Sequence, residues 1–126
     1  MAYRVSKAEF ARLVELALAE LPENFARFLE EVPVEIREVP TPQQLSRIKL
    51  APGSLLLGLY TGRPRTKRSV EDFGTMPDII SIFQHNIEQV VNNEKDLIEQ
   101  VRKTVLHEIG HHFGMSEEDL DELGYG

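Results

Sequence analysis

The residues best suited to chemistry are His107, Glu108 and His111, which form a His-Glu-x-x-His pattern in the last fifth of the chain. Four residues of an α-helix turn through about 400°, so the two imidazoles leave one helix face one turn apart. That spacing lets two neutral ring nitrogens bind one Zn²⁺ at about 2.0–2.1 Å. A glutamate directly after the first histidine lies where it can act as a general base on water. The pattern therefore predicts a hydrolytic zinc site.

The surrounding sequence favours a helix that could carry this pattern. Between Asn93 and Phe113 there is no proline, and there is no glycine before Gly110. Apolar residues recur at helical spacing, which is typical of a helix with one buried side. They are Leu97, Ile98, Val101, Val105, Leu106 and Ile109. The motif fixes only three positions, so a helix that carries two surface histidines by accident is the alternative.

A third metal ligand is expected after the helix, because a catalytic zinc ion takes three protein ligands and keeps one position open for water. Gly114 can adopt the positive φ that ends a helix and turns the chain back toward the metal. Two acidic residues follow this glycine at suitable distances, Glu117 and Asp119. We predict Glu117 as the third ligand, with Asp119 as the alternative.

The segment from His107 to Glu117 resembles the extended metzincin motif, His-Glu-x-x-His-x-x-Gly-x-x-(His or Asp), whose last residue is the third zinc ligand. Glu117 stands at that position, where the usual residue is His or Asp. The whole chain resembles the minimal zincin family of small bacterial metallopeptidase-like proteins, through its length, residues 56–62, residues 77–83 and the terminal motif with residues 123–125. The resemblance implies a compact α+β zincin-like core.

The composition describes one ordinary globular domain, residues 1–126, with a net charge of −7 and no cysteine. The absence of cysteine leaves only nitrogen and oxygen ligands for a metal. The negative charge argues against nucleic acid as a partner. Residues 1–10 lack the apolar region of a signal peptide, and residues 55–60 form an apolar run too short to span a bilayer. We therefore expect a cytoplasmic protein that acts on a peptide or protein substrate, with neither nucleic acid nor a membrane as its partner.

Helices and strands are expected in an α+β order. Ser6 to Glu9 has the form of a capping box, and Pro22 separates the helix that it starts from a second, shorter one. The remaining predicted elements are a strand at 32–36, a short helix at 41–48, strands at 55–60 and 79–84, the motif helix at 93–113 and a short helix from 116 to about 124. Three strands with helices packed mainly on one side give an α+β domain with a small sheet.

Residues 79–84 directly precede the motif helix, so we predict that they form the sheet edge beside the site. An extended peptide can add to such an edge through backbone hydrogen bonds. Ile80 and Ile82 are the predicted substrate-binding residues of this strand. The alternative is a sheet strand that binds no ligand.

Several other polar residues are more typical of structural or surface roles. His112 points about 100° away from His111 around the helix, so packing is expected rather than metal binding. His85 is expected to be a surface histidine, and Tyr125 could either pack or donate to a developing oxyanion. The basic segment 63–68 is predicted to be a solvated loop, and it lacks the interleaved aromatic residues that stack bases.

Together these features predict a zinc-dependent metallopeptidase that uses Glu108 as its general base. The first alternative is a catalytically weak zincin-like protein that binds metal or peptide, because so short a chain has little material for deep pockets. The others are an interaction domain with an accidental motif and a nucleic-acid accessory that uses the basic segment.

Overall fold

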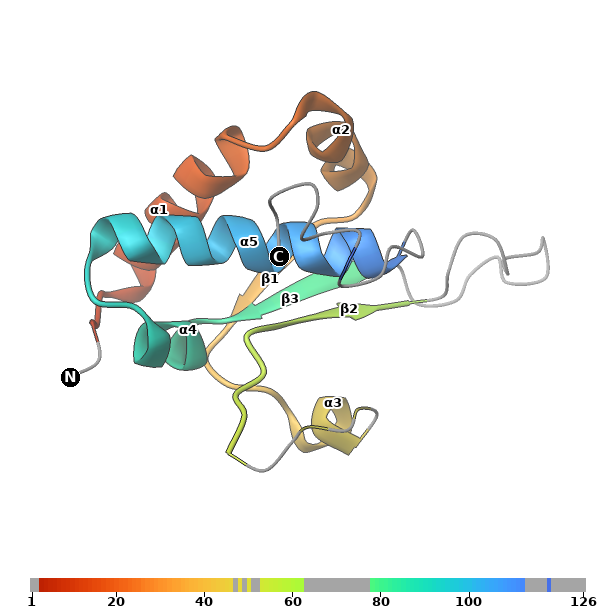
Figure 1. The fold of residues 1–126 in the computed structure, drawn as a ribbon. Helices are drawn as coiled ribbons and strands as arrows, with labels where there is room; N and C mark the ends of the chain where they lie inside the picture. Colours follow the sequence, from red (N-terminus) through yellow and green to blue (C-terminus); the bar gives the residue numbers. More distant parts are fainter. Residues whose placement is uncertain are drawn as a thin grey trace.

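The computed structural model describes residues 3–46, 48, 50, 53–62, 78–112 and 118. Five helices and three strands are described within these ranges (Figure 1). In chain order they are α1 (Lys7–Ala19), α2 (Glu23–Glu31), β1 (Val34–Arg37), α3 (Pro42–Ser46), β2 (Gly58–Thr61), β3 (Ile79–Phe83), α4 (Gln84–Val90) and α5 (Glu94–His112). In the described part of the chain no helix has the length and apolar character needed to cross a membrane.

The three strands form a mixed sheet in the order β1-β3-β2. β1 runs parallel to β3, with Val34 opposite Ile80, and β2 runs antiparallel to β3, with Gly58 opposite Ile82. The α+β fold class and the three-stranded mixed sheet are therefore confirmed.

The prediction that residues 79–84 form the sheet edge is wrong, because β3 is the central strand and has a partner on each side. Its sequence, Ile-Ile-Ser-Ile-Phe, is a nearly continuous apolar run, which is typical of a strand buried on both faces. Ile80 and Ile82 are fully buried in the core. Their side chains cannot bind substrate, and the edge strand beside α5 is β2 instead.

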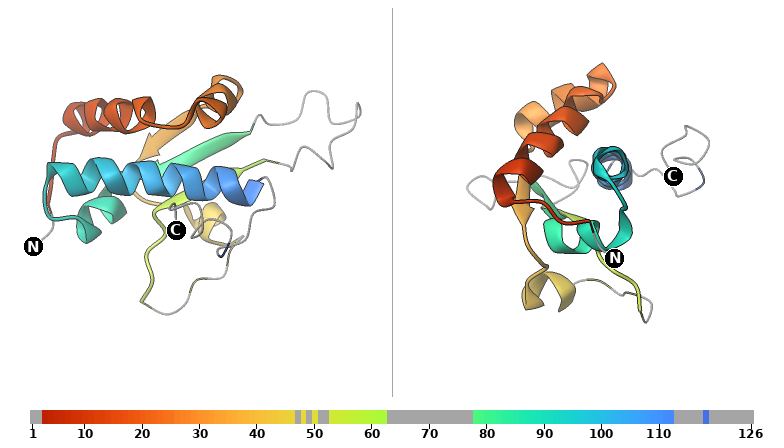
Figure 2. Two further views of the ribbon diagram at one scale, coloured as in Figure 1. Left: turned by 45° about the horizontal axis from the view of Figure 1, so that its top comes forward. Right: turned by 90° about the vertical axis from the view of Figure 1, so that its left-hand side faces the viewer.

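The helices are unevenly distributed over the sheet. Figures 1 and 2 show α1, α2 and α5 over one face and α3 on the opposite side. The core lies between the sheet, α1 and α5. Ile87 of α4 and Val32, the residue after α2, are also fully buried, but most of the largest fully buried side chains come from the sheet, α1 and α5. They include Phe10, Leu13, Ile80, Ile82, Phe83, Leu97, Leu106 and Ile109. Because α5 is packed against this core, its last turns are held in a fixed position beside the sheet.

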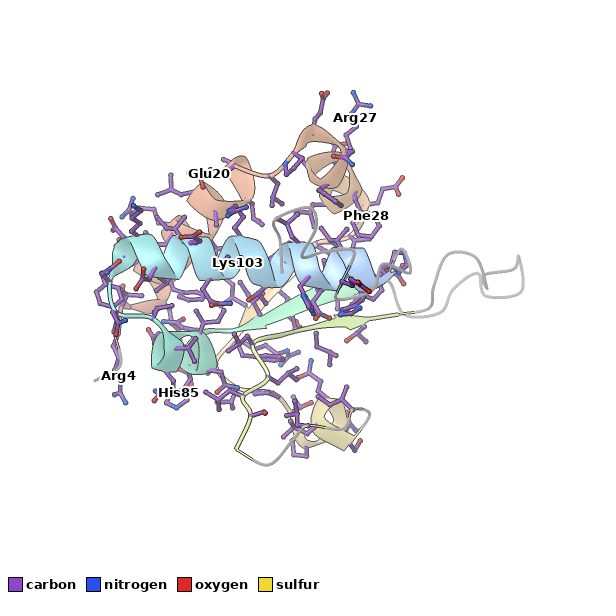
Figure 3. The ribbon with its side chains drawn as sticks, in the orientation of Figure 1. Arg4, Glu20, Arg27, Phe28, His85 and Lys103 are labelled. Carbon is purple, nitrogen blue, oxygen red and sulfur yellow. The ribbon has the colours of Figure 1, made fainter. Side chains whose placement is uncertain are left out.

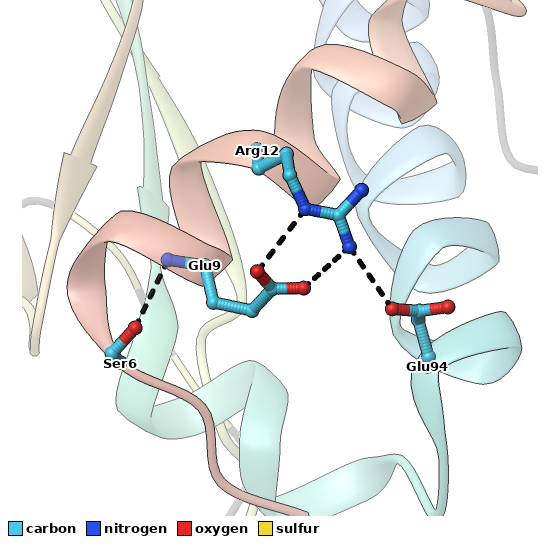
Figure 4. Close-up of polar contacts among 4 residues, drawn as sticks. All are labelled: Ser6, Glu9, Arg12 and Glu94. Atoms are coloured by element: carbon cyan, nitrogen blue, oxygen red, sulfur yellow. Dashed lines mark hydrogen bonds and ion pairs between the residues drawn. The ribbon is translucent and has the colours of Figure 1, made fainter.

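The start of α1 confirms the predicted cap. The Ser6 hydroxyl accepts a hydrogen bond from the Glu9 backbone N–H at 3.1 Å. Figure 4 shows Arg12 bonded to the Glu9 carboxylate and, at 3.2 Å, to Glu94 in the first turn of α5. Exposed ion pairs of this kind contribute little to stability, so the packed apolar faces, rather than this contact, set the position of α5.

Helix α4 was not predicted, because three of its polar residues are buried and hydrogen-bonded instead of lying on a solvated face. Gln84 donates to the Val5 carbonyl at 3.1 Å, and Asn86 donates to the Leu56 carbonyl at 2.8 Å. The Glu88 carboxylate accepts from the Val5 N–H at 2.9 Å. Without an apolar stripe at helical spacing, such a helix has no amphipathic pattern for the sequence to reveal.

Candidate metal centre

The last turns of α5 bring the two motif histidines together. The Nε2 atoms of His107 and His111 lie 2.8 Å apart, and the rings meet edge to face with centroids 4.4 Å apart. Two nitrogens at about 2.0–2.1 Å from a tetrahedral zinc ion are about 3.3 Å apart. The rings therefore converge on one point, and they need to separate by only about 0.5 Å to bind the same ion. This pair of imidazoles fits a zinc ion.

The predicted third ligand cannot be placed, since Glu117 and Asp119 both lie outside the described residues. The same is true of Gly114, Tyr125 and the basic segment 63–68. Among the residues that are described, no group of three His, Cys, Asp or Glu side chains could hold a metal ion. The described part of the site thus supplies two nitrogen donors, and the acidic third ligand stays a prediction.

Within the described residues β2 is an edge strand of the sheet, and Glu108 is bound to it. Its Oε1 atom accepts a hydrogen bond from the Tyr60 backbone N–H at 2.9 Å. Residues of an antiparallel strand alternate between bonding their neighbour and facing outward. Tyr60 in β2 is one of the outward residues, because its N–H is directed to α5 rather than to β3. The sequence showed a strand here, but it did not show that this strand is the edge or that it meets Glu108.

A glycine sets the close approach of β2 to α5. A Cβ atom at Gly58 would lie 2.5 Å from the Thr104 Cγ2 atom and 3.2 Å from the Ser81 carbonyl oxygen. Both distances are shorter than ordinary van der Waals contact, so a larger residue would force the strand away from the helix. Two residues further along the strand, the same approach brings the Tyr60 N–H within hydrogen-bonding distance of Glu108.

Tyr60 also supports the end of α5 through its side chain. Its ring stacks on His112, with centroids 4.4 Å apart and an interplanar angle of 19°. Its hydroxyl donates a hydrogen bond of 2.6 Å to the buried carboxylate of Asp78. Phe28 of α2 packs on the same histidine at 5.4 Å. His112 therefore packs among aromatic rings, as predicted, and holds the last turn of α5 against β2.

Two hollows lie on either side of Glu108 along β2. The first, of about 430 Å³, is called the Lys103 hollow here and is lined by residues 55–58, Gln100, Lys103, Thr104, His107 and Glu108. The second, of about 420 Å³, is called the Tyr60 hollow and is lined by Ile48, Leu50, Leu56, Gly58, Leu59, Tyr60, Gly62, Glu108, His111 and His112. The paired histidines and the glutamate thus line open space on both sides.

Three of the residues considered from the sequence lie away from this centre. Ile80 and Ile82 are in the core and line neither hollow. His85 is exposed on α4, at the end of the molecule where α5 begins (Figure 3). The described centre consequently comprises the end of α5 and the edge of β2.

Comparison with known proteins identifies a similar fold and a family. A solved structure of a conserved hypothetical protein from Thermo thermophilus is similar to the chain, with 26% sequence identity and a TM-score of 0.55 over 86% of this chain and 94% of that one. A search of curated proteins gives no match. A family model described as zincin-like metallopeptidase matches residues 29–126, which include the paired histidines and the glutamate. Because that match covers well over half of the chain, the protein belongs to the zincin-like metallopeptidase family.

Proposed function

We propose that the protein hydrolyses peptide bonds with the help of a zinc ion. The observation that carries this proposal is the convergence of the His107 and His111 Nε2 atoms, 2.8 Å apart, directly beside Glu108. Paired imidazoles with an adjacent carboxylate are the groups that zinc-dependent hydrolysis needs. Membership of the zincin-like metallopeptidase family supports the same conclusion.

His107 and His111 would hold the metal, and Glu117 or Asp119 would complete the set. Nitrogen and oxygen donors of this kind suit zinc, and a chain without cysteine offers no thiolate. When bound, zinc lowers the pKa of a water molecule toward 7 and polarises the carbonyl of the scissile bond. The chain's own residues must then align the peptide and move the proton.

Glu108 is the group that moves the proton. Its carboxylate takes a proton from the attacking water and later delivers it to the leaving amine. A general base must be held within hydrogen-bonding reach of its proton, and the Tyr60 N–H fixes the Glu108 carboxylate at 2.9 Å. A positioned acid–base group contributes about 10²–10⁴-fold to the rate.

The outer edge of β2, which has no strand partner among the described residues, is the surface on which an extended peptide would lie. β2 borders both hollows beside Glu108, and backbone hydrogen bonds can add a peptide strand to an exposed sheet edge. This edge takes the role that the sequence assigned to residues 79–84. Gly58 lines both hollows, so the strand edge is close to the motif where it runs from one hollow to the other.

A second candidate function is binding of metal or peptide with little turnover. One observation favours it: the Tyr60 N–H, an outward donor that an added peptide strand would use, is bonded to Glu108. In this arrangement the Glu108 carboxylate takes up the backbone N–H that a docked peptide would need, and that N–H in turn holds the proposed base. A peptide would have to replace that bond before hydrolysis.

The decisive experiment combines metal content with turnover. The untagged protein is purified without chelators, its zinc is measured by mass spectrometry, and a fluorogenic peptide library is supplied to it. We expect about one zinc ion per chain and measurable hydrolysis. Glu108→Gln should keep the metal and lose about 10²–10⁴-fold in rate.

The matched control is Glu99→Gln, which removes the same charge from another face of α5. Glu99 is half exposed and its only ion pair among the described residues is with Arg102 at 3.8 Å. Hydrolysis at the wild-type rate in Glu108→Gln would contradict the assigned base. Tight peptide binding without turnover in the wild-type protein would favour the second function.

A further inference from the structure

A lysine lies in the Lys103 hollow, one helical turn before the first metal-binding histidine. Lys103 and His107 are four residues apart, so their side chains emerge on the same face of α5. Both line the same hollow of about 430 Å³, together with Glu108 (Figure 3 shows Lys103 on α5). A positive charge is therefore located within about one turn of helix, roughly 6 Å along the face, of the proposed reaction centre.

Lys103 has no acidic partner among the described residues. The natural candidate is Glu99, one turn earlier on the helix, but its carboxylate pairs with Arg102 at 3.8 Å. Lys103 is half buried beside the leucines at 55–57. A cation that is partly removed from water and forms no ion pair with the described residues favours an incoming anion.

Gln100 adds a second donor to the same hollow. Its Nε2 atom donates to the Thr104 hydroxyl at 3.1 Å, which holds the amide along the helix face. An amide nitrogen carries two hydrogens, and Thr104 uses one of them. Lys103 and Gln100 are three residues apart, so their donors can act on one group.

We propose that the Lys103 hollow is a subsite for a carboxylate of the substrate, bound by Lys103 with help from Gln100. The inference rests on the proposed peptidase function, because it names the substrate class of that same site: peptides with an acidic group on one side of the bond that is cut. The Tyr60 hollow differs, since its lining is apolar apart from Tyr60, Glu108 and the two histidines of the α5 end. The acidic group is accordingly accepted on one side only.

Two sources could supply this carboxylate, an internal aspartate or glutamate side chain and the C-terminus of a short peptide. Both present two oxygens to the same ammonium group, so the hollow recognises their shared chemistry. The two sources are separated by amidation, which removes the terminal charge and leaves an internal glutamate unchanged.

The test measures binding as well as turnover. Three libraries of short peptides with acetylated N-termini are used. The first has glutamate at one fixed position and an amidated C-terminus. The second has glutamine at that position and an amidated C-terminus, and the third has glutamine there and a free C-terminus. Their dissociation constants are measured by fluorescence anisotropy on zinc-loaded Glu108→Gln, which cannot cut them. Each is repeated in a Lys103→Met background and in a Lys95→Met background, which removes a lysine of the same helix from outside the hollow.

We expect a carboxylate-containing library to bind about five- to tenfold more tightly than the amidated glutamine library. Lys103→Met should abolish this preference and Lys95→Met should keep it. Raised salt should reduce the preference, as for any partly exposed ion pair. A preference for the amidated glutamate library assigns the hollow to an acidic side chain, and a preference for the free C-terminus assigns it to the end of the substrate.

Failure of this inference differs from failure of the proposed function. No preference, no binding by any library, or a preference that survives Lys103→Met overturns the carboxylate subsite, whatever the turnover. If the Lys103-dependent preference is present and the wild-type protein cuts none of the peptides, the subsite stands and the hydrolytic function fails. Loss of the glutamate preference in wild-type kcat/KM on Lys103→Met would support both.

Discussion

The two faces of α5 differ in composition, burial and role. The face toward the sheet and α1 is apolar and fully buried, and consists of Leu97, Val101, Val105, Leu106 and Ile109. The face toward the edge of β2 carries Gln100, Lys103, His107, Glu108 and His111, which are half buried or exposed. The residues of α5 that stabilise the fold and those of the candidate site therefore lie about half a turn apart around the same helix. Substitutions on one face should change the fold and leave metal binding intact, and those on the other should do the reverse.

The largest effect that would test this separation is expected for His111→Ala. Losing an outer-shell partner of a ligand already costs about 10–100-fold in metal affinity, so losing the ligand itself should weaken zinc binding by at least about 100-fold. His111 is exposed, so the metal-free protein should keep its unfolding free energy within about 0.5 kcal/mol. Zinc affinity is measured by chelator competition, and stability by urea unfolding with a chelator present.

The control for His111→Ala is His85→Ala on α4, an exposed histidine away from the centre. It should change neither property. A large loss of metal-free stability in His111→Ala would break the comparison, because it would mean that the polar face also holds the fold together.

The opposite result is expected for Leu97→Ala on the buried face. Deleting a fully buried leucine side chain costs about 2–5 kcal/mol of unfolding free energy. The folded protein should still bind zinc with wild-type affinity, since Leu97 lies in the first turn of α5 and His107 lies ten residues further on. Urea unfolding and zinc titration below the transition measure the two quantities. A weaker zinc affinity in the folded variant would show that the faces are coupled.

A smaller and mixed effect is expected at Gly58, where β2 touches α5. Gly58→Ala places a Cβ atom 2.5 Å from the Thr104 Cγ2 atom, and such overpacking costs about 1–3 kcal/mol. Moving the strand also moves the Tyr60 N–H away from Glu108, so turnover should fall with stability. Thermal unfolding and peptide turnover measure the two effects.

Thr104→Ser provides the matched rescue for Gly58→Ala. It removes the Cγ2 atom and keeps the hydroxyl that Gln100 donates to. The double variant should recover stability, because the clash with the Thr104 Cγ2 atom is gone. The recovery should be only partial, because the close contact of 3.2 Å with the Ser81 carbonyl oxygen remains. Equal stability of Gly58→Ala with and without Thr104→Ser would contradict the steric explanation.

The smallest expected effect is on the pH dependence of stability. It concerns Glu35 in β1, on the side of the sheet away from β2. Burial raises the pKa of Glu35, but hydrogen bonds from Ser81 and Arg37 and the charge of Arg37 outweigh it and hold the pKa below its ordinary value of 4.5. A lowered pKa in the folded state means that the unfolded chain binds the proton more readily. The stabilisation is therefore present above pH 4.5 and is lost as the pH falls through the lower, folded pKa.

Glu35→Gln removes this dependence. Urea unfolding between neutral and acidic pH should show a shallower loss of stability for Glu35→Gln than for the wild-type protein. Glu23→Gln is the control, because that carboxylate is 81% exposed and, within the described ranges, pairs only with Arg27 one turn along α2. Parallel curves for the wild-type protein and Glu35→Gln would refute a role for Glu35.

The sequence predicted the elements whose residues alternate between apolar and polar at a regular period. α5 was predicted at 93–113 and runs from Glu94 to His112, and the break at Pro22 between α1 and α2 was also correct. β2 begins at Gly58 rather than at Leu55, because residues 55–57 are apolar but mostly line the hollow instead of pairing. The pattern of apolar residues indicates which side chains are buried. It cannot distinguish a strand that pairs with its neighbour from an unpaired extended segment next to that strand.

The site could be predicted only in part, for a different reason. The spacing of His107 and His111 is local to one helix, so their convergence follows from helical geometry alone. The bond from Tyr60 to Glu108 joins residues 48 positions apart, and the central place of β3 depends on which strands pair. Neither leaves a local signal in a single sequence.

The hydrogen bond from the Tyr60 N–H to Glu108 has a consequence for self-association. An edge strand with unpaired N–H groups is a template onto which a strand of another chain can add, and proteins commonly protect such edges with charge. At Tyr60 the outward N–H is already bonded to a carboxylate, and the negative charge disfavours the approach of a second carbonyl. The residue proposed for proton transfer thus also makes this one position of β2 less open to a strand of a neighbouring copy.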